Sequence, residues 1–155
     1  MQFIPCILWL LVLCVGIAPA RSADCAQLNN LLGVPDLKTL ATGPLQAKSV
    51  EQSKIAPARV ALEGVGVQCV VRITDRQGYE CARPFKETNN EKLVRAVTNF
   101  AASWRPCLAG WKEDYFAELK YTGFVGFTFT KGDKKIVFYT LGGEMVFAFS
   151  DRIAD

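Results

Sequence analysis

Three carboxylates cluster beside aromatic side chains in the second half of the chain. Glu113, Asp114 and Glu118 follow Trp111 closely. Two acids beside an aromatic platform are what a sugar-cleaving site needs. Residues 111–115 join a predicted helix to a predicted strand, where charged residues are typical of a solvated loop. We favour the loop and keep a small glycan-active hydrolase as an alternative.

Other catalytic chemistry lacks the residues that it needs. The chain contains no histidine, which removes serine–histidine and cysteine–histidine nucleophiles and the commonest general base. Neither a GxSxG elbow nor a P-loop nor an SxxK motif occurs. These absences favour a non-catalytic protein, and we predict no cofactor and no metal.

The cysteines predict disulfides rather than a metal site. Of six cysteines, two lie in the apolar N-terminal stretch and four follow it. The four are separated by 44, 12 and 26 residues, without the paired spacing of a zinc knuckle. We predict two bridges, which are Cys69–Cys81 and Cys25–Cys107.

The first bridge joins residues on either side of a predicted hairpin turn, and the second joins the ends of two predicted helices. A two-residue turn at Arg76-Gln77 would place Cys81 opposite Arg72 rather than Cys69. The hairpin bridge therefore requires a bulge, a longer loop or loosely paired strands.

The N-terminus predicts export. Residues 1–20 contain no charged side chain and are almost continuously apolar. Cleavage is expected after Ala20, with Ser22 as a second position, and an uncleaved anchor is the alternative. Residues 21–155 then form a single disulfide-stabilised domain, periplasmic or secreted, without stable membrane insertion. The net charge of +3 is too small to indicate a nucleic-acid partner.

Two helices are expected. Residues 23–32 form a short one that Gly33 and Pro35 end. Thr88 and Glu91 fit a capping box, and a longer amphipathic helix follows over 91–104. Its apolar stripe predicts that it covers a sheet, and the stripe consists of Leu93, Val97, Phe100, Ala101 and Trp104.

Strand patterns occupy most of the remaining chain. Residues 60–74 are rich in valine and predict a strand. A turn at 75–78 reverses the chain, and the residues from Tyr79 through Cys81 form the second strand of a hairpin. Residues 34–59 have a weaker pattern and predict a partly ordered connection. Gly132-Asp133 and Gly142-Gly143 divide the C-terminal third into a three-stranded meander with two-residue turns.

Those two turns fix the registers of the meander. They place Phe127 opposite Phe138, and Phe138 opposite Phe147, on one continuous apolar face that a one-residue slip would scramble. The fold class is therefore α+β, an antiparallel sheet of about five strands with two helices packed on one face. The five strands are the hairpin plus the three-stranded meander.

The second face of the meander is about half apolar, more than a solvated face requires. Phe124, Tyr139, Leu141 and Val146 are its candidate binding residues. Either residues 34–59 or the first hairpin cover it, or it is a surface for a partner or an apolar ligand. The leading hypothesis is a small exported binding protein that recognises an envelope or extracellular protein, or an apolar ligand, through the sheet. A structural envelope component is a further alternative.

Overall fold

The computed structural model describes residues 24–48, 53–66, 68–119 and 123–152. The predicted export signal and its cleavage positions lie outside these ranges. Within them the chain forms two α-helices, two 3₁₀ helices and eight strands. The helices are α1 (Cys25–Leu32), η1 (Leu37–Leu40), α2 (Asn90–Trp104) and η2 (Arg105–Leu108).

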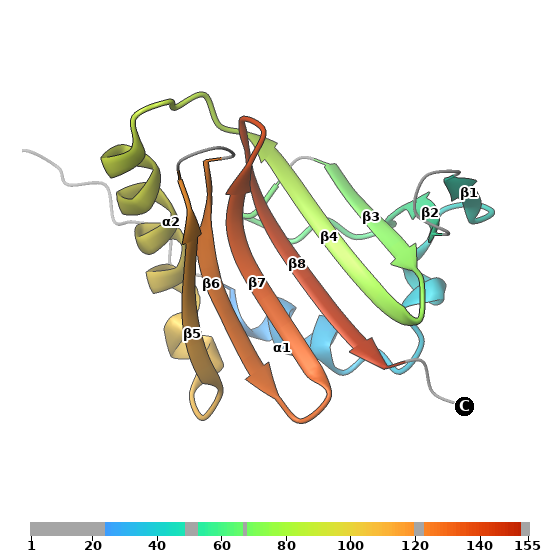
Figure 1. The fold of residues 1–155 in the computed structure, drawn as a ribbon. Coiled ribbons are helices and arrows are strands. Elements are labelled where there is room, and N and C mark those ends of the chain that lie inside the picture. The colour runs from blue at the N-terminus through green and yellow to red at the C-terminus, as the bar shows by residue number, and fades with distance from the viewer. Residues whose placement is uncertain (1–23, 49–52, 67, 120–122, 153–155) are drawn as a thin grey trace, which may run out of the picture.

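All eight strands belong to one antiparallel sheet in the order β1-β2-β3-β4-β8-β7-β6-β5 (Figure 1). Their bounds are β1 (Gln46–Lys48), β2 (Ser53–Pro57), β3 (Gln68–Ile73), β4 (Arg76–Pro84), β5 (Lys112–Glu118), β6 (Phe124–Lys131), β7 (Lys134–Leu141) and β8 (Glu144–Arg152). Both α-helices lie behind the sheet in this view, on the same face. We call this the helix face and the opposite one the outer face.

The two halves of the chain repeat one arrangement. Each half consists of an α-helix, a 3₁₀ helix and four consecutive strands. The last strands of the halves, β4 and β8, pair antiparallel at the middle of the sheet. The sheet is therefore built from two four-stranded meanders joined at their final strands.

The expectation of about five strands was wrong, because three strands lacked a recognisable pattern. The two buried residues of β2 are Ser53 and Ala56, which are small and lie on opposite faces, so β2 lacks a stripe of large apolar residues. β1 has only three residues, all exposed. The run at 111–115, predicted as a loop, lies mostly in the edge strand β5. Edge strands often carry charged residues that discourage pairing with other chains, so their sequences resemble loops.

The turn of the first hairpin lies two residues earlier than the predicted two-residue turn at Arg76-Gln77, and the strand pairing is three residues out of the predicted register. The turn lies at Thr74 and Asp75, where the Thr74 hydroxyl accepts a hydrogen bond from the Arg76 amide. Arg76 and the residues after it belong to β4. The shifted turn places Cys69 directly opposite Cys81, so the bridge needs no bulge.

Residues 60–66, predicted as strand, form an irregular segment before β3. Gly64 has a φ of +76°, a conformation that other residues adopt only with strain. Gly66 lies so close to β4 that a Cβ there would be 2.7 Å from the Ala82 carbonyl oxygen. Both glycines therefore shape a loop that crosses close to the sheet.

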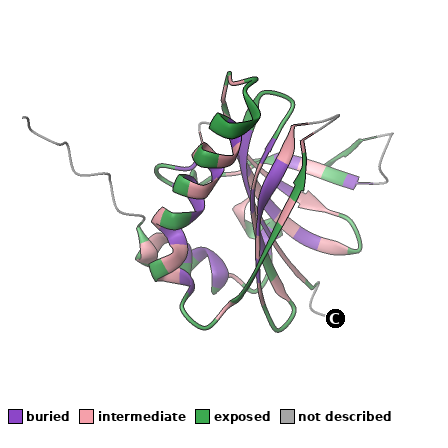
Figure 2. Ribbon diagram, turned by 60° about the vertical axis from the view of Figure 1, so that its left-hand side comes forward, coloured by how far each residue is buried: buried purple, intermediate pink, exposed green. Residues whose placement is uncertain are grey.

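The registers predicted for the C-terminal meander are confirmed. Phe127 pairs with Phe138, and Phe138 pairs with Phe147. The predicted apolar face is buried under the helices (Figure 2). Its one polar member, Thr140, donates a hydrogen bond to the Gly123 carbonyl oxygen at 2.9 Å, which removes the cost of burying an unpaired hydroxyl.

The long helix forms where the periodicity predicts, but with a different cap. Asn89, rather than Thr88, is the N-cap, and its side chain accepts from the Lys92 amide at 3.0 Å. Glu87 accepts from the amides of Thr88 and Asn89, so the predicted capping box does not form. The short helix is capped by Asp24, whose carboxylate accepts two amide hydrogen bonds.

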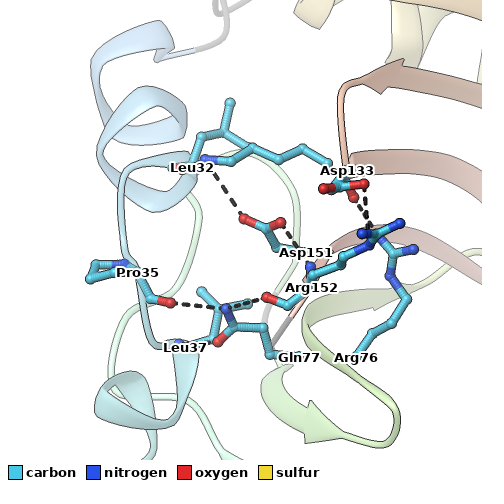
Figure 3. Close-up of polar contacts among 9 residues, drawn as sticks. Leu32, Pro35, Leu37, Arg76, Gln77, Asp133, Asp151 and Arg152 are labelled. Carbon is cyan, nitrogen blue, oxygen red and sulfur yellow. Dashed lines mark hydrogen bonds and ion pairs between the residues drawn. The ribbon is translucent and has the colours of Figure 1, made fainter. Parts of the chain in front are cut away.

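The buried side chain of Gln77 forms hydrogen bonds that link the segment at 35–37 to the sheet (Figure 3). The Gln77 side chain accepts from the Leu37 amide at 2.7 Å and donates to the carbonyl oxygens of Pro35 and Arg152 at 2.9 and 3.0 Å. Its amide group therefore joins η1, β4 and the end of β8. The sequence placed Gln77 in a solvated turn, which its 3 % exposure corrects.

Both predicted disulfides are confirmed. Cys25 bonds Cys107 and Cys69 bonds Cys81, with Cα–Cα distances of 5.1 and 4.1 Å. Two disulfides in one small domain indicate an oxidising, extracellular type of compartment. Within the described ranges, no helix is long and apolar enough to cross a bilayer.

Candidate functional site

The outer face is not covered in either of the ways that the sequence suggested. The first hairpin extends the sheet as β3 and β4, and the described parts of 34–59 form η1, β1 and β2. Leu37 of η1 belongs to the core on the helix face. No described helix or loop crosses in front of β6, β7, β8 and β4 in Figure 1.

Three aromatic rings gather on this face across the strands β5, β6 and β7. The rings of Phe116 and Phe124 have centroids 4.8 Å apart, and those of Phe124 and Tyr139 are 5.5 Å apart, edge to face. All three side chains are half-buried. We call Phe116, Phe124 and Tyr139 the aromatic cluster. Each such ring pair contributes about 0.5–1.5 kcal/mol beyond the area it buries.

Gly126 makes the close packing of the cluster possible. A Cβ at this position would lie 2.7 Å from Cζ of Phe116 and 2.8 Å from Cβ of Tyr139. The Phe116 ring therefore lies against bare backbone on β6, an arrangement in which an aromatic side chain shields a strand glycine. A larger residue at 126 would push the rings apart.

The structure places the four sequence-predicted residues differently. Phe124 and Tyr139 join the aromatic cluster. Val146 pairs with Tyr139 on one side and Ala82 on the other, and only 3 % of it is exposed. Leu141 lies at the end of β7 and is 46 % exposed. Val146 is therefore a buried neighbour of Tyr139 and not available to a partner. Leu141 extends the exposed part of the outer face toward the β7–β8 turn.

Charged side chains border the cluster on the first half of the sheet. Arg72 and Glu80 form an ion pair at 3.8 Å. Burial raises the pKa of Tyr139 to about 12, with Glu80 and Glu144 adding to the rise and Arg72 opposing it. The Tyr139 hydroxyl stays protonated at physiological pH. It forms no hydrogen bond within the described ranges, so it can donate one to a partner.

Sequence reasoning missed three residues of this surface, namely Phe116, Arg72 and Glu80. Phe116 directly follows the run at 111–115 that was predicted as a loop, although Asp114, Phe116 and Glu118 occupy alternate positions, as residues on one face of a strand do. Arg72 and Glu80 reach the surface only because β4 pairs with β8. That pairing joins residues sixty or more positions apart, and no local signal indicates it.

The three carboxylates near Trp111 lie along the edge strand β5. Adjacent side chains on a strand point to opposite faces, so Glu113 is on the helix face and Asp114 on the outer face. Glu113 accepts two hydrogen bonds from Arg105 Nε at 3.1 and 3.0 Å. Asp114 pairs with Lys112 at 3.0 Å.

Asp114 and Glu118 share the outer face, four positions apart on β5. That separation is about 13 Å along an extended strand, longer than the roughly 5–10 Å between the acids of glycosidases. The strand therefore does not bring these carboxylates together as a catalytic pair. Among the described residues, no group of three or more potential ligand side chains is placed to hold a metal ion.

No protein-family model matches the chain, and neither a curated protein nor a solved structure matches it. The function is therefore inferred from the geometry of the described residues.

Proposed function

We propose that the chain is an exported, non-catalytic binding protein, periplasmic or secreted, that recognises a protein partner through its outer sheet face. The aromatic cluster with Leu141 is the observation that carries this proposal. Large apolar side chains are left half-exposed on a face that no described element crosses. Exposed apolar patches of this kind are typical of interaction surfaces.

The composition of the face suits a protein partner. Aromatic residues and arginine are enriched at protein–protein interfaces and supply most of the binding energy. Here the cluster lies beside Arg72, and the Tyr139 hydroxyl is an unused donor. These groups provide apolar area together with polar contacts that fix orientation.

The shape of the face favours a protein over a small ligand. Small molecules bind in pockets that bury most of their surface. Phe116, Phe124 and Tyr139 line neither the pocket beside α1 nor the pocket beside the β7–β8 turn. A sheet face of this breadth is better matched by another protein surface.

The test is site-specific photo-cross-linking of the mature protein in the exported fraction of the producing cells. A photo-reactive side chain replaces Leu141, which is 46 % exposed on the outer face, or Tyr115, which is 52 % exposed on the helix-face side of β5. Adducts with a protein are expected from position 141 and not from position 115.

A point variant tests whether the adduct depends on the aromatic cluster. Phe124→Ser should abolish cross-linking from position 141 while the protein remains folded. Adducts of equal yield from both positions would mean non-specific contact and contradict the proposal. Absence of any adduct from position 141 would favour a structural role instead.

A further inference from the structure

A separate pocket lies on the helix face, between α1, η1, residues 60–62 and β4. Its volume is about 260 Å³. Six apolar or aromatic side chains form its walls, namely Leu31, Val34, Leu40, Val60, Leu62 and Tyr79. It is distinct from the outer face, because Tyr79 pairs with Phe149 on the helix side of the sheet.

The pocket exists because the two halves of the chain cover the sheet unequally. In the second half, α2 has 15 residues and packs Phe100 and Trp104 against Phe138. In the first half, α1 has 8 residues and buries only leucines. The short helix leaves part of the first half to a loop and to η1, and the space between them is not filled by a side chain.

Gln27 and Tyr79, two of the three residues around the pocket with polar side-chain groups, already form hydrogen bonds. The Gln27 amide donates to the Ala61 carbonyl oxygen at 2.9 Å and accepts from the Glu63 amide at 2.8 Å. The Tyr79 hydroxyl donates to the Val60 carbonyl oxygen at 2.6 Å. These bonds hold residues 60–63 against α1 and β4. Because they occupy the Gln27 amide and the Tyr79 hydroxyl, neither group is free to donate to a charged ligand.

One polar side chain at the pocket is not hydrogen-bonded to the described residues. Asn30 is an exposed lining residue whose side-chain amide forms no hydrogen bond with the described residues. None of the lining residues is Asp, Glu, Lys or Arg. A bound molecule would therefore meet apolar walls and a single neutral amide at the surface.

The geometry points to a binding site for one uncharged, apolar molecule, or for the alkyl end of an amphiphile whose polar head lies at Asn30. The size supports this occupant. A cavity of about 150 Å³ with aliphatic walls binds benzene, so a pocket of about 260 Å³ accommodates a chain of about eight to ten carbons. Such a ligand would cover Val60, which is 44 % exposed.

Straight-chain primary alcohols from butanol to decanol are the probes. Binding to the mature, oxidised protein is followed by methyl chemical shifts and by the rise in thermal midpoint. The dissociation constant should fall about fourfold with each added methylene and level off near eight to ten carbons. The shifts should concentrate on the methyl groups of Leu31, Val34 and Val60.

Two substitutions at one position provide the decisive comparison. Val60→Trp places a large ring at the pocket mouth and should weaken octanol binding at least tenfold, while Val60→Ala leaves the pocket open and should change it only a few-fold. If Val60→Trp fails to fold, Leu40→Phe fills the same space from η1. An equal octanol affinity in a folded, pocket-filled variant would overturn the proposal.

The outer-face variant Leu141→Ser separates this site from the proposed protein-binding surface. Octanol binding should be unchanged in this variant. Methyl shifts confined to Leu141 and Val146 would place the alcohol on the outer face and overturn the pocket proposal without affecting the protein-binding one. An affinity independent of chain length would also overturn it.

Discussion

Phe138 is the centre of the aromatic core, and truncating it tests the packing of the whole second half. Its side chain is fully buried. Ring centroids of four other aromatic residues lie between 5.3 and 6.2 Å from its own, and these residues are Phe100, Trp104, Phe129 and Phe147. Phe138→Ala removes one wall from each of these contacts and leaves a cavity among rigid rings.

The expected loss is about 3–5 kcal/mol of unfolding free energy, because aromatic-to-alanine changes combine lost transfer energy with a cavity that neighbours cannot fill. For a domain of this size the thermal midpoint should fall by roughly 10–20 °C. Urea denaturation monitored by tryptophan fluorescence, with disulfides intact, measures the free energy, and thermal unfolding of the same variant measures the midpoint. Phe138→Leu retains most of the volume and should cost less than about 1.5 kcal/mol.

The matched control is Lys135→Ala on the same strand. Lys135 is exposed, so its truncation should change stability by no more than about 0.5 kcal/mol. Lys134, beside the Gly132-Asp133 turn, is unsuitable as a control, because its ammonium contacts the Leu32 carbonyl oxygen and pairs with Asp151 at 3.7 Å. If Phe138→Ala and Lys135→Ala unfold at similar urea concentrations, the described core packing is refuted.

Three other outcomes are expected. Gln77→Leu should cost about 3 kcal/mol in urea denaturation, because it leaves three backbone groups unpaired; a loss below about 1 kcal/mol would contradict the anchoring role. Removing the Cys25–Cys107 bridge, which spans 82 residues, should cost about 4.5 kcal/mol, and removing the hairpin bridge, which spans 12, about 2.8 kcal/mol; the reverse order in thermal unfolding would contradict the loop-entropy argument. Burial raises the pKa of Tyr79 from 10.0 to about 12. The unfolded phenol ionises first, so the stability contributed by neutral Tyr79 is complete below pH 10.0 and is lost as the pH rises toward about 12. In Tyr79→Phe the free energy of unfolding should lose this part of its pH dependence. The ultraviolet titration of the same variant should still show Tyr139 ionising near pH 12.

The local elements with strong patterns are predictable from the sequence because their determinants are adjacent residues. The paired glycine turns fix the register of the C-terminal meander, since a side-chain period of two allows only one alignment that keeps Phe127, Phe138 and Phe147 on one face. The stripe of the long helix follows from its 3.6-residue period. The Cys25–Cys107 bridge follows from the two helix ends near which these cysteines lie. The predicted hairpin register opposed the Cys69–Cys81 bridge, and the shifted turn in the structure removes that conflict.

The candidate surface was predictable only in part, because only some of its residues are aligned by neighbouring parts of the sequence. Phe124 and Tyr139 are in the meander, and their alignment follows from its turns. Phe116 belongs to an edge strand whose charged neighbours conceal it, and Arg72 arrives through the pairing of β4 with β8. Pairing between distant strands depends on long-range closure of the chain, which local sequence patterns do not encode.

By itself, the sequence determined both α-helices, the meander register and the half-apolar character of its outer face, since these depend on residue type and periodicity. Only the tertiary structure decided how far each residue is exposed. Val146 and Leu141 are both aliphatic and both on the outer face, yet one lies between Tyr139 and Ala82 and the other ends its strand. The pocket beside α1 likewise arises from the meeting of four separate segments. Exposure and cavities are properties of what surrounds a residue, and those surroundings exist only once distant parts of the chain have packed.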